Sequence, residues 1–219
     1  MVKRSQLEHA LRAAKEVTGE NEFIVVGSAS ILGSFPVKGE AITLATREID
    51  IYPRFHPKKS IQLEAIGRDS PFSVTHGFWI DSVGPETATL PKGWEERLVK
   101  VCNENTNGAI GWRLDPHDVA VSKLVAHRPK DIEFVEAILK SGAGDANIIR
   151  KRLAETEIPH RQILNMAESH LDQILDDIKA ARVGKAKPHD LKKLMDDMGI
   201  SMPEKKPSRG RGRDFEPGP

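Results

Sequence analysis

Apolar residues near the N-terminus recur with the spacing of an amphipathic helix. Leu7, Leu11 and Ala14 lie on one face of that helix, and Gly19 stands where it would end. The next apolar run, residues 23–26, is short and continuous, which is typical of a central strand covered on both faces. The pattern therefore predicts a surface helix followed directly by a buried strand.

Two later segments alternate between polar and apolar side chains, as strands do. Glu48 and Asp50 share one face of the first segment, and the isoleucines that follow them take the other face. The second segment, residues 77–83, carries Asp81 on the same face as Trp79. Asp81 is therefore either a third carboxylate near the first two or an acid at the exit of its strand.

The rest of the chain predicts a hairpin and then helices only. Strands over residues 97–101 and 109–114 flank a segment rich in asparagine, which favours a turn. Asp115 followed by Pro116 is a strong helix start, and Pro129 opens a second helix. Other helices are predicted over residues 59–67, 146–155, 159–182 and 190–198.

This order of elements predicts an α+β fold with a mixed sheet, in which a helical part follows the strands. We expect an α/β domain over residues 1–114 and a helical domain over 115–200. Residues 201–219 are rich in Pro, Gly, Lys and Arg and almost free of apolar side chains. They predict a disordered basic tail, because such a composition cannot build a core.

Composition narrows the class of protein without indicating its activity. The chain has 219 residues, of which 38% are hydrophobic and 30% charged, as in a soluble globular protein. A net charge of +1 means that any electrostatic recognition must come from local patches. Because no apolar run is long enough to span a membrane, we expect a cytoplasmic protein. The single cysteine, Cys102, is expected to be buried and favours a reducing compartment.

Two features carry candidate chemistry. Glu48 and Asp50 repel each other on one strand face, an arrangement that a divalent cation such as Mg²⁺ would stabilise. Gly27 and Ser28 follow the buried strand, and small residues at such a turn offer free N–H groups to a phosphate. Each has a simpler explanation when taken alone, as an acidic strand face and as an ordinary turn. Their combination favours a site.

That combination resembles the nucleotidyltransferase superfamily, which has the DNA polymerase β-like fold. The resemblance rests on a Gly-Ser turn after a buried strand, an acid-x-acid strand and an acid on a further strand. Residues 114–131, LDPHDVAVSKLVAHRPKD, are similar to AbiEii-like toxins and related small uncharacterised bacterial nucleotidyltransferases. Those proteins pair a helical lysine with an Arg-x-Lys-Asp element. The resemblance covers roughly residues 23–139 and implies a nucleotidyltransferase-like domain with a helical C-terminal part.

The resemblance assigns roles to the residues at the turn and on the strands. Gly27 and Ser28 would hold the triphosphate of a nucleoside triphosphate (NTP). Glu48, Asp50 and Asp81 would be the catalytic carboxylates and would hold two Mg²⁺ ions.

The resemblance also assigns roles within residues 114–131. Lys123 would contact the nucleotide phosphates as a further catalytic group. Arg128 and Lys130 would add positive charge near the triphosphate, and Asp131 would support the site from the next helix. These residues complete the implied nucleotide-binding set.

The implied function is Mg²⁺-dependent transfer of a nucleoside monophosphate from NTP to an acceptor, either RNA such as tRNA or a protein. Analogy alone adds a toxin of a toxin–antitoxin or phage-defence system, with a cognate antitoxin as partner. The alternative is a catalytically degenerate module that binds nucleotide or a partner protein. Glu48 in place of the usual Asp, and a longer spacer between Ser28 and Glu48, motivate this alternative. The sequence leaves the oligomeric state open.

Overall fold

The computed structural model describes residues 2–32 and 46–185. The chain divides into two compact units, Met1–Leu175 and Asp176–Pro219. Only residues 176–185 of the second unit are described, as the end of helix α6 (Arg161–Lys185). The predicted helix over 190–198 and the predicted tail over 201–219 lie outside the described residues. The predicted domain limits stay a prediction.

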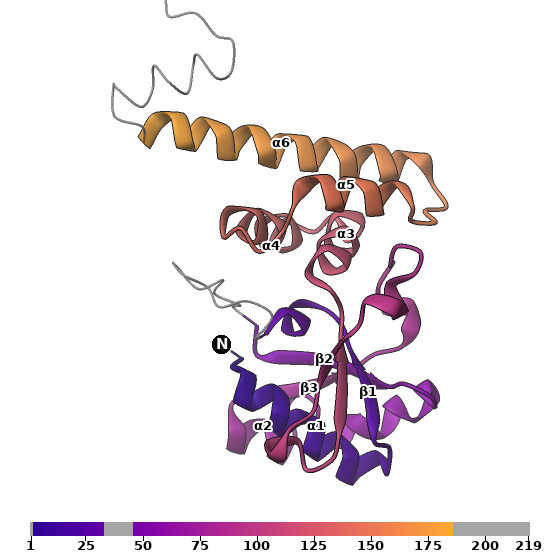
Figure 1. Cartoon of the computed structure of the whole chain (residues 1–219). Helices are drawn as coiled ribbons and strands as arrows, with labels where there is room; N and C mark the ends of the chain where they lie inside the picture. The colour runs from indigo at the N-terminus through magenta and orange to yellow at the C-terminus, as the bar shows by residue number, and fades with distance from the viewer. Residues whose placement is uncertain (1, 33–45, 186–219) are drawn as a thin grey trace, which may run out of the picture. The chain divides into compact units, whose positions relative to one another are not determined.

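A five-stranded mixed sheet forms the centre of the first unit, with the strand order β3-β2-β1-β5-β4. Figure 1 labels its strands β1, β2 and β3. β1 pairs antiparallel with β2 and parallel with β5, while β2 pairs parallel with β3. β4 and β5 form the predicted antiparallel hairpin. The mixed sheet confirms the predicted α+β class. The strands are β1 (Glu22–Val25), β2 (Glu48–Pro53), β3 (Trp79–Ser82), β4 (Val99–Val101) and β5 (Ile110–Arg113).

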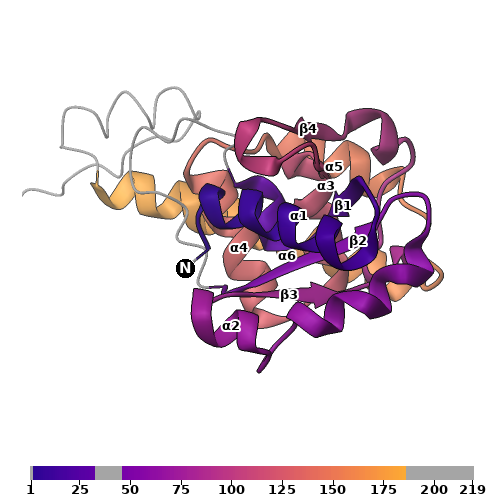
Figure 2. The same cartoon turned by 90° about the horizontal axis from the view of Figure 1, so that it is seen from below.

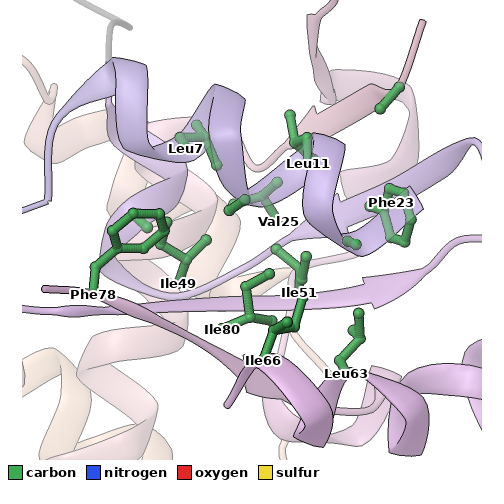
Figure 3. Close-up of a cluster of buried hydrophobic side chains, with 14 of the residues drawn as sticks. Leu7, Leu11, Phe23, Val25, Ile49, Ile51, Leu63, Ile66, Phe78 and Ile80 are labelled. Carbon is green, nitrogen blue, oxygen red and sulfur yellow. The ribbon is translucent and has the colours of Figure 1, made fainter. Parts of the chain in front are cut away.

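Helix α1 (Arg4–Thr18) and the 3₁₀ helix η2 (Pro57–Ile66) pack on one face of this sheet. The alternation predicted for β2 and β3 is confirmed there, since Ile49, Ile51 and Ile80 all point into this core (Figure 3). Leu7 and Leu11 of α1 are fully buried against them, which fixes the faces of both strands. Figure 2 shows α1 lying over β1 and β2.

The opposite face of the sheet meets helices from later in the chain. Tyr52 of β2 and Ile24 of β1 share a second core with Val119 and Phe134. The helices on this side are α3 (Pro116–Ala126), α4 (Pro129–Lys140) and α5 (Ala146–Ala154).

Among the described residues, no helix has the length and hydrophobicity needed to cross a membrane.

Helix starts were predicted more accurately than helix types. As expected, the Asp115 side chain caps α3 by accepting a hydrogen bond from the backbone N–H of His117, at 2.9 Å. The predicted helix over 59–67 is the 3₁₀ helix η2, and the residues after Gly27 form the short 3₁₀ turn η1 (Ser28–Ile31).

Two further local features differ from the prediction. Helix α2 (Pro71–His76) was not predicted, although Ser70 caps it and Pro71 stands at its first position. The expectation that Cys102 is buried is wrong, since its side chain is exposed. β4 ends one residue earlier, and Val101 takes the buried position of that strand end.

Candidate active site

A pocket of about 550 Å³ lies between the sheet and the helices α3 and α4. Its walls come from the turn after β1, from β2 and β3, and from both helices, so that segments far apart in the sequence meet there. All the residues that the sequence singled out for a site line it. They are Gly27, Ser28, Glu48, Asp50, Asp81, Lys123, Arg128, Lys130 and Asp131.

Strands β2 and β3 carry three carboxylates on the face that borders the pocket. Their parallel pairing sets Asp50 opposite Asp81, and Glu48 opposite Trp79. Among the described residues, no three His, Cys, Asp or Glu side chains already stand close enough together to hold a metal ion. The three carboxylates therefore line the pocket without converging on one point.

The electrostatic surroundings of Asp50 nevertheless suit a cation. Burial, together with the negative charges of Glu48 and Asp81, raises the pKa of Asp50 to about 7, although Lys123 and Lys130 oppose the shift. A cation beside Asp50 would relieve the cost of ionising this carboxyl group. Because the metal-binding atoms that β2 and β3 place at the pocket are carboxylate oxygens, the set fits a hard ion such as Mg²⁺.

Gly27 lies in the turn that follows the buried strand β1, directly against Asp50. Its φ of +61° is a conformation that residues with a β-carbon rarely adopt. A β-carbon at Gly27 would stand 1.9 Å from Oδ2 of Asp50, so any other residue there would displace this carboxylate. The glycine thus allows the turn to form. It also lets the Asp50 carboxylate approach the backbone of Gly27, which the sequence analysis assigned to phosphate binding.

Arg113 fixes the turn that follows Gly27, and the sequence analysis missed it. It lies at the end of β5 opposite Val25, with 4% of its surface exposed. Its Nη1 donates hydrogen bonds to the carbonyl oxygens of Ser30, at 3.1 Å, and Leu32, at 2.5 Å. One signal was available in the sequence, because a charged residue at the end of a strand of mostly apolar residues requires buried acceptors.

The positive side of the pocket is organised by Asp131, which is 1% exposed. Lys123 Nζ donates to Asp131 Oδ1 at 2.7 Å, and Arg128 Nε donates to Oδ2 at 2.5 Å. Burial alone would raise the pKa of Asp131, but the hydrogen bonds from both cations outweigh it and lower the pKa. Lys130 is exposed and lines the same pocket. Asp131 therefore holds the side chains of Lys123 and Arg128 at the pocket wall.

A second buried carboxylate, absent from the sequence prediction, anchors helix α3. Asp118 is fully buried and accepts two hydrogen bonds from Arg97, from Nε and Nη2, both at 3.0 Å. Arg152 Nη1 donates to the same carboxylate at 2.9 Å. These bonds join α3 to α5 and to the 3₁₀ helix η4 (Trp94–Arg97). Since Lys123 is on α3, the network also helps to position the positively charged side of the pocket.

Comparison with known proteins identifies a family at the level of sequence. No curated protein and no solved structure matches the chain. The comparisons therefore do not confirm the finer resemblance to AbiEii-like toxins. They do confirm the broader resemblance to nucleotidyltransferases. A family model described as a nucleotidyltransferase of unknown function (DUF6036) matches residues 5–195, and the chain belongs to this family.

Proposed function

We propose that this protein is a Mg²⁺-dependent nucleotidyltransferase that transfers a nucleoside monophosphate from NTP to an acceptor. The observation that supports this best is the meeting of an acidic wall and a basic wall in one pocket. The acidic wall carries Glu48, Asp50 and Asp81, and the basic wall carries Lys123 and Arg128. A magnesium-bound triphosphate needs both, because the ion requires oxygen ligands and the phosphates require positive charge.

Glu48, Asp50 and Asp81 would hold Mg²⁺, and the three carboxylates suit the two ions that this chemistry uses. When bound, Mg²⁺ would polarise the α-phosphate and neutralise negative charge on the leaving pyrophosphate. The raised pKa of Asp50 supports this assignment, because the positive charges of Lys123 and Lys130 do not offset burial and the two neighbouring acids.

The chain itself would position the nucleotide. Small residues at Gly27 and Ser28 let the β- and γ-phosphates approach the backbone of the turn. Lys123, Arg128 and Lys130 would neutralise phosphate charge. Because Asp131 already fixes Lys123 and Arg128, little side-chain freedom is lost when the nucleotide binds.

The reaction is a displacement at the α-phosphorus. An acceptor oxygen would form a bond to that phosphorus while the bond to the oxygen bridging the α- and β-phosphates breaks. Pyrophosphate would leave with the electron pair of the broken bond. The proton of the acceptor hydroxyl would pass to Asp81, which is exposed at the pocket and thus accessible to an acceptor.

Label transfer tests this function. Purified protein with NTP labelled in the α-phosphate, Mg²⁺ and a cell extract should produce a labelled RNA or protein. Asp50→Asn should abolish the transfer, whereas Glu104→Gln, an exposed acid outside the pocket, should leave it intact. Transfer that persists in Asp50→Asn would contradict the assignment of the carboxylates.

A degenerate binding module remains the alternative, and one observation favours it. In the described part of the chain the carboxylates do not converge as a ready-made metal site, and the first of them is Glu48 with its longer side chain. Such a module would bind nucleotide equally well with and without Mg²⁺ in a calorimetric titration and would show no transfer. Loss of nucleotide binding on chelation of Mg²⁺ would exclude it.

A toxin role, with a cognate antitoxin as partner, rests only on the resemblance of residues 114–131 to AbiEii-like proteins. Expression of the intact chain in a bacterium tests it. Growth arrest that Asp50→Asn relieves would support toxicity, and unimpaired growth would count against it.

A further inference from the structure

An indole with two guanidinium groups near its ring lines the pocket and has no part in the chemistry described so far. The Cζ atom of Arg68 lies 4.8 Å from the centroid of the Trp79 ring, and that of Arg47 lies 5.8 Å from it. All three side chains line the pocket together with Thr46. Arg47 is held in place because its Nε donates a hydrogen bond to the carbonyl of Gly77, at 3.0 Å.

This group occupies a defined side of the carboxylates. Trp79 precedes Asp81 by two residues on β3 and so shares its strand face, opposite Glu48 on β2. β1, which leads to Gly27, lies on the other side of β2 in the strand order. The acids of β2, Glu48 and Asp50, therefore lie between the turn at Gly27 and the strand that carries Trp79.

That arrangement indicates which of the two substrates, the nucleotide or the acceptor, contacts the indole of Trp79. In an in-line displacement the attacking oxygen approaches the phosphorus opposite the leaving group. If the pyrophosphate part of the nucleotide lies at the turn after β1, the acceptor must approach from the side of β3. Trp79, Arg47 and Arg68 are then the side chains that an acceptor meets next to Asp81.

The chemistry of the three side chains indicates the class of acceptor. An indole offers a flat surface on which a nucleobase can stack, and guanidinium groups pair with backbone phosphates. Because the chain as a whole carries a charge of only +1, such a local patch is needed to attract a polyanion. The hydroxyl of a folded protein would supply neither the base nor the phosphate.

We propose that Trp79, Arg47 and Arg68 form the acceptor subsite and that the acceptor is the end of a single-stranded RNA. The terminal base stacks on Trp79, and the adjoining phosphates pair with the two arginines. This inference rests on the proposed nucleotidyltransferase function, since the direction of attack defines the acceptor side.

Binding of a fluorescent single-stranded RNA, measured by anisotropy without NTP, tests the subsite independently of turnover. Trp79→Leu should weaken RNA binding roughly 10-fold, within the range of a lost base–aromatic stack. Trp79→Phe should recover most of the affinity. Replacing Arg47 and Arg68 together by Gln should weaken binding and flatten its dependence on salt.

Trp112 provides a matched control. Its ring also lies beside a guanidinium, with Cζ of Arg54 at 4.7 Å from the centroid, but it is not among the residues that line the pocket. Trp112→Leu should therefore leave RNA affinity unchanged. Thermal melting of each variant distinguishes a lost contact from a lost fold.

The failure of this inference is distinguishable from failure of the proposed function. Calorimetry with Mg²⁺ and NTP serves as the second measurement, and Trp79→Leu should bind the nucleotide as the wild type does. If the wild type binds NTP but not RNA, or if Trp79→Leu binds RNA normally, the acceptor subsite is wrong and the transferase function stands. If the wild type fails to bind NTP, both are wrong.

Discussion

The carboxylate of Asp50 lies so close to the backbone of Gly27 that a β-carbon there would stand 1.9 Å from Oδ2. Gly27→Ala should therefore displace the carboxylate and also strain a backbone with φ of +61°. We expect a loss of Mg²⁺-dependent stabilisation together with a stability loss of about 2–4 kcal/mol, measured by urea denaturation.

Gly19→Ala is the control for that substitution. Gly19 also has a positive φ, +68°, but a β-carbon there would meet nothing within 4 Å. Its replacement should cost only the backbone strain, about 1 kcal/mol. Equal losses for the two variants would show that the contact with Asp50 has no energetic effect.

The raised pKa of Asp50 predicts the sign of a pH effect on stability. Between its usual value of 3.8 and the folded value of about 7, the folded state binds more protons than the unfolded state. The contribution of Asp50 to the free energy of unfolding is therefore most favourable below about pH 4 and is lost as the pH rises to 7. Asp50→Asn should be more stable than wild type at pH 8, by on the order of 4 kcal/mol, and this gain should vanish near pH 4. A constant difference across that window would contradict the shift.

Magnesium should reverse this penalty. Mg²⁺ beside Asp50 favours the ionised form, so it should raise the melting temperature of the wild type, and more at pH 8 than at pH 6. At an ion concentration of 100 times the dissociation constant the stabilisation would be about 2.7 kcal/mol. Asp50→Asn should lose most of the increase, Glu104→Gln should keep it, and EDTA should abolish it. An equal increase in both variants would indicate binding elsewhere.

The network around Asp118 predicts a large loss of stability. Asp118→Ala leaves the guanidinium groups of Arg97 and Arg152 without their shared carboxylate, and we expect a cost of about 3–5 kcal/mol by urea denaturation. Asp172→Ala is the matched control, because Asp172 pairs with Arg150 at the surface, where the two side chains are 60% and 44% exposed. That pair should contribute at most about 1 kcal/mol. Similar losses for both variants would contradict a special role for Asp118.

Removal of Arg113 should affect nucleotide binding more than metal binding. Arg113→Met leaves the carbonyls of Ser30 and Leu32 without these hydrogen bonds and so loosens the turn after Gly27. We expect NTP affinity to fall about 10-fold, while the stabilisation by Mg²⁺ alone persists, because β2 and β3 are untouched. Calorimetry and melting curves measure the two quantities separately. A parallel loss of both would indicate general unfolding.

The sequence predicted the strand faces well because their information is local. A period of two places Glu48, Asp50 and Asp81 opposite the buried isoleucines, and the sheet confirms each face. The start of α3 was equally clear, since a capping Asp followed by proline acts within one turn. The pocket also gathers every residue that the motifs selected, although their catalytic roles stay predictions.

Contacts between distant segments were not predictable in the same way. Arg113 binds carbonyls 83 and 81 residues earlier, and Arg152 binds Asp118 from 34 residues later, so no local period records either contact. The arginines beside Trp79 come from two separate segments for the same reason. The type of η2 was missed because a partial apolar face does not distinguish a 3₁₀ helix from an α-helix.

The position of Asp131 determines how positive and negative charges are arranged in the pocket before a substrate binds. By pairing with Lys123 and Arg128 it keeps both cations at their own wall, rather than leaving them free to collapse onto the acids of β2. The pocket therefore presents separated regions of opposite sign before any substrate arrives. A metal–triphosphate complex has the same separation of charge, because its ion is positive and its outer phosphate oxygens are negative. Under the proposed function, Asp131 would make the protein an electrostatic template for that complex, because the two walls of the pocket would match the ion and the phosphates in sign.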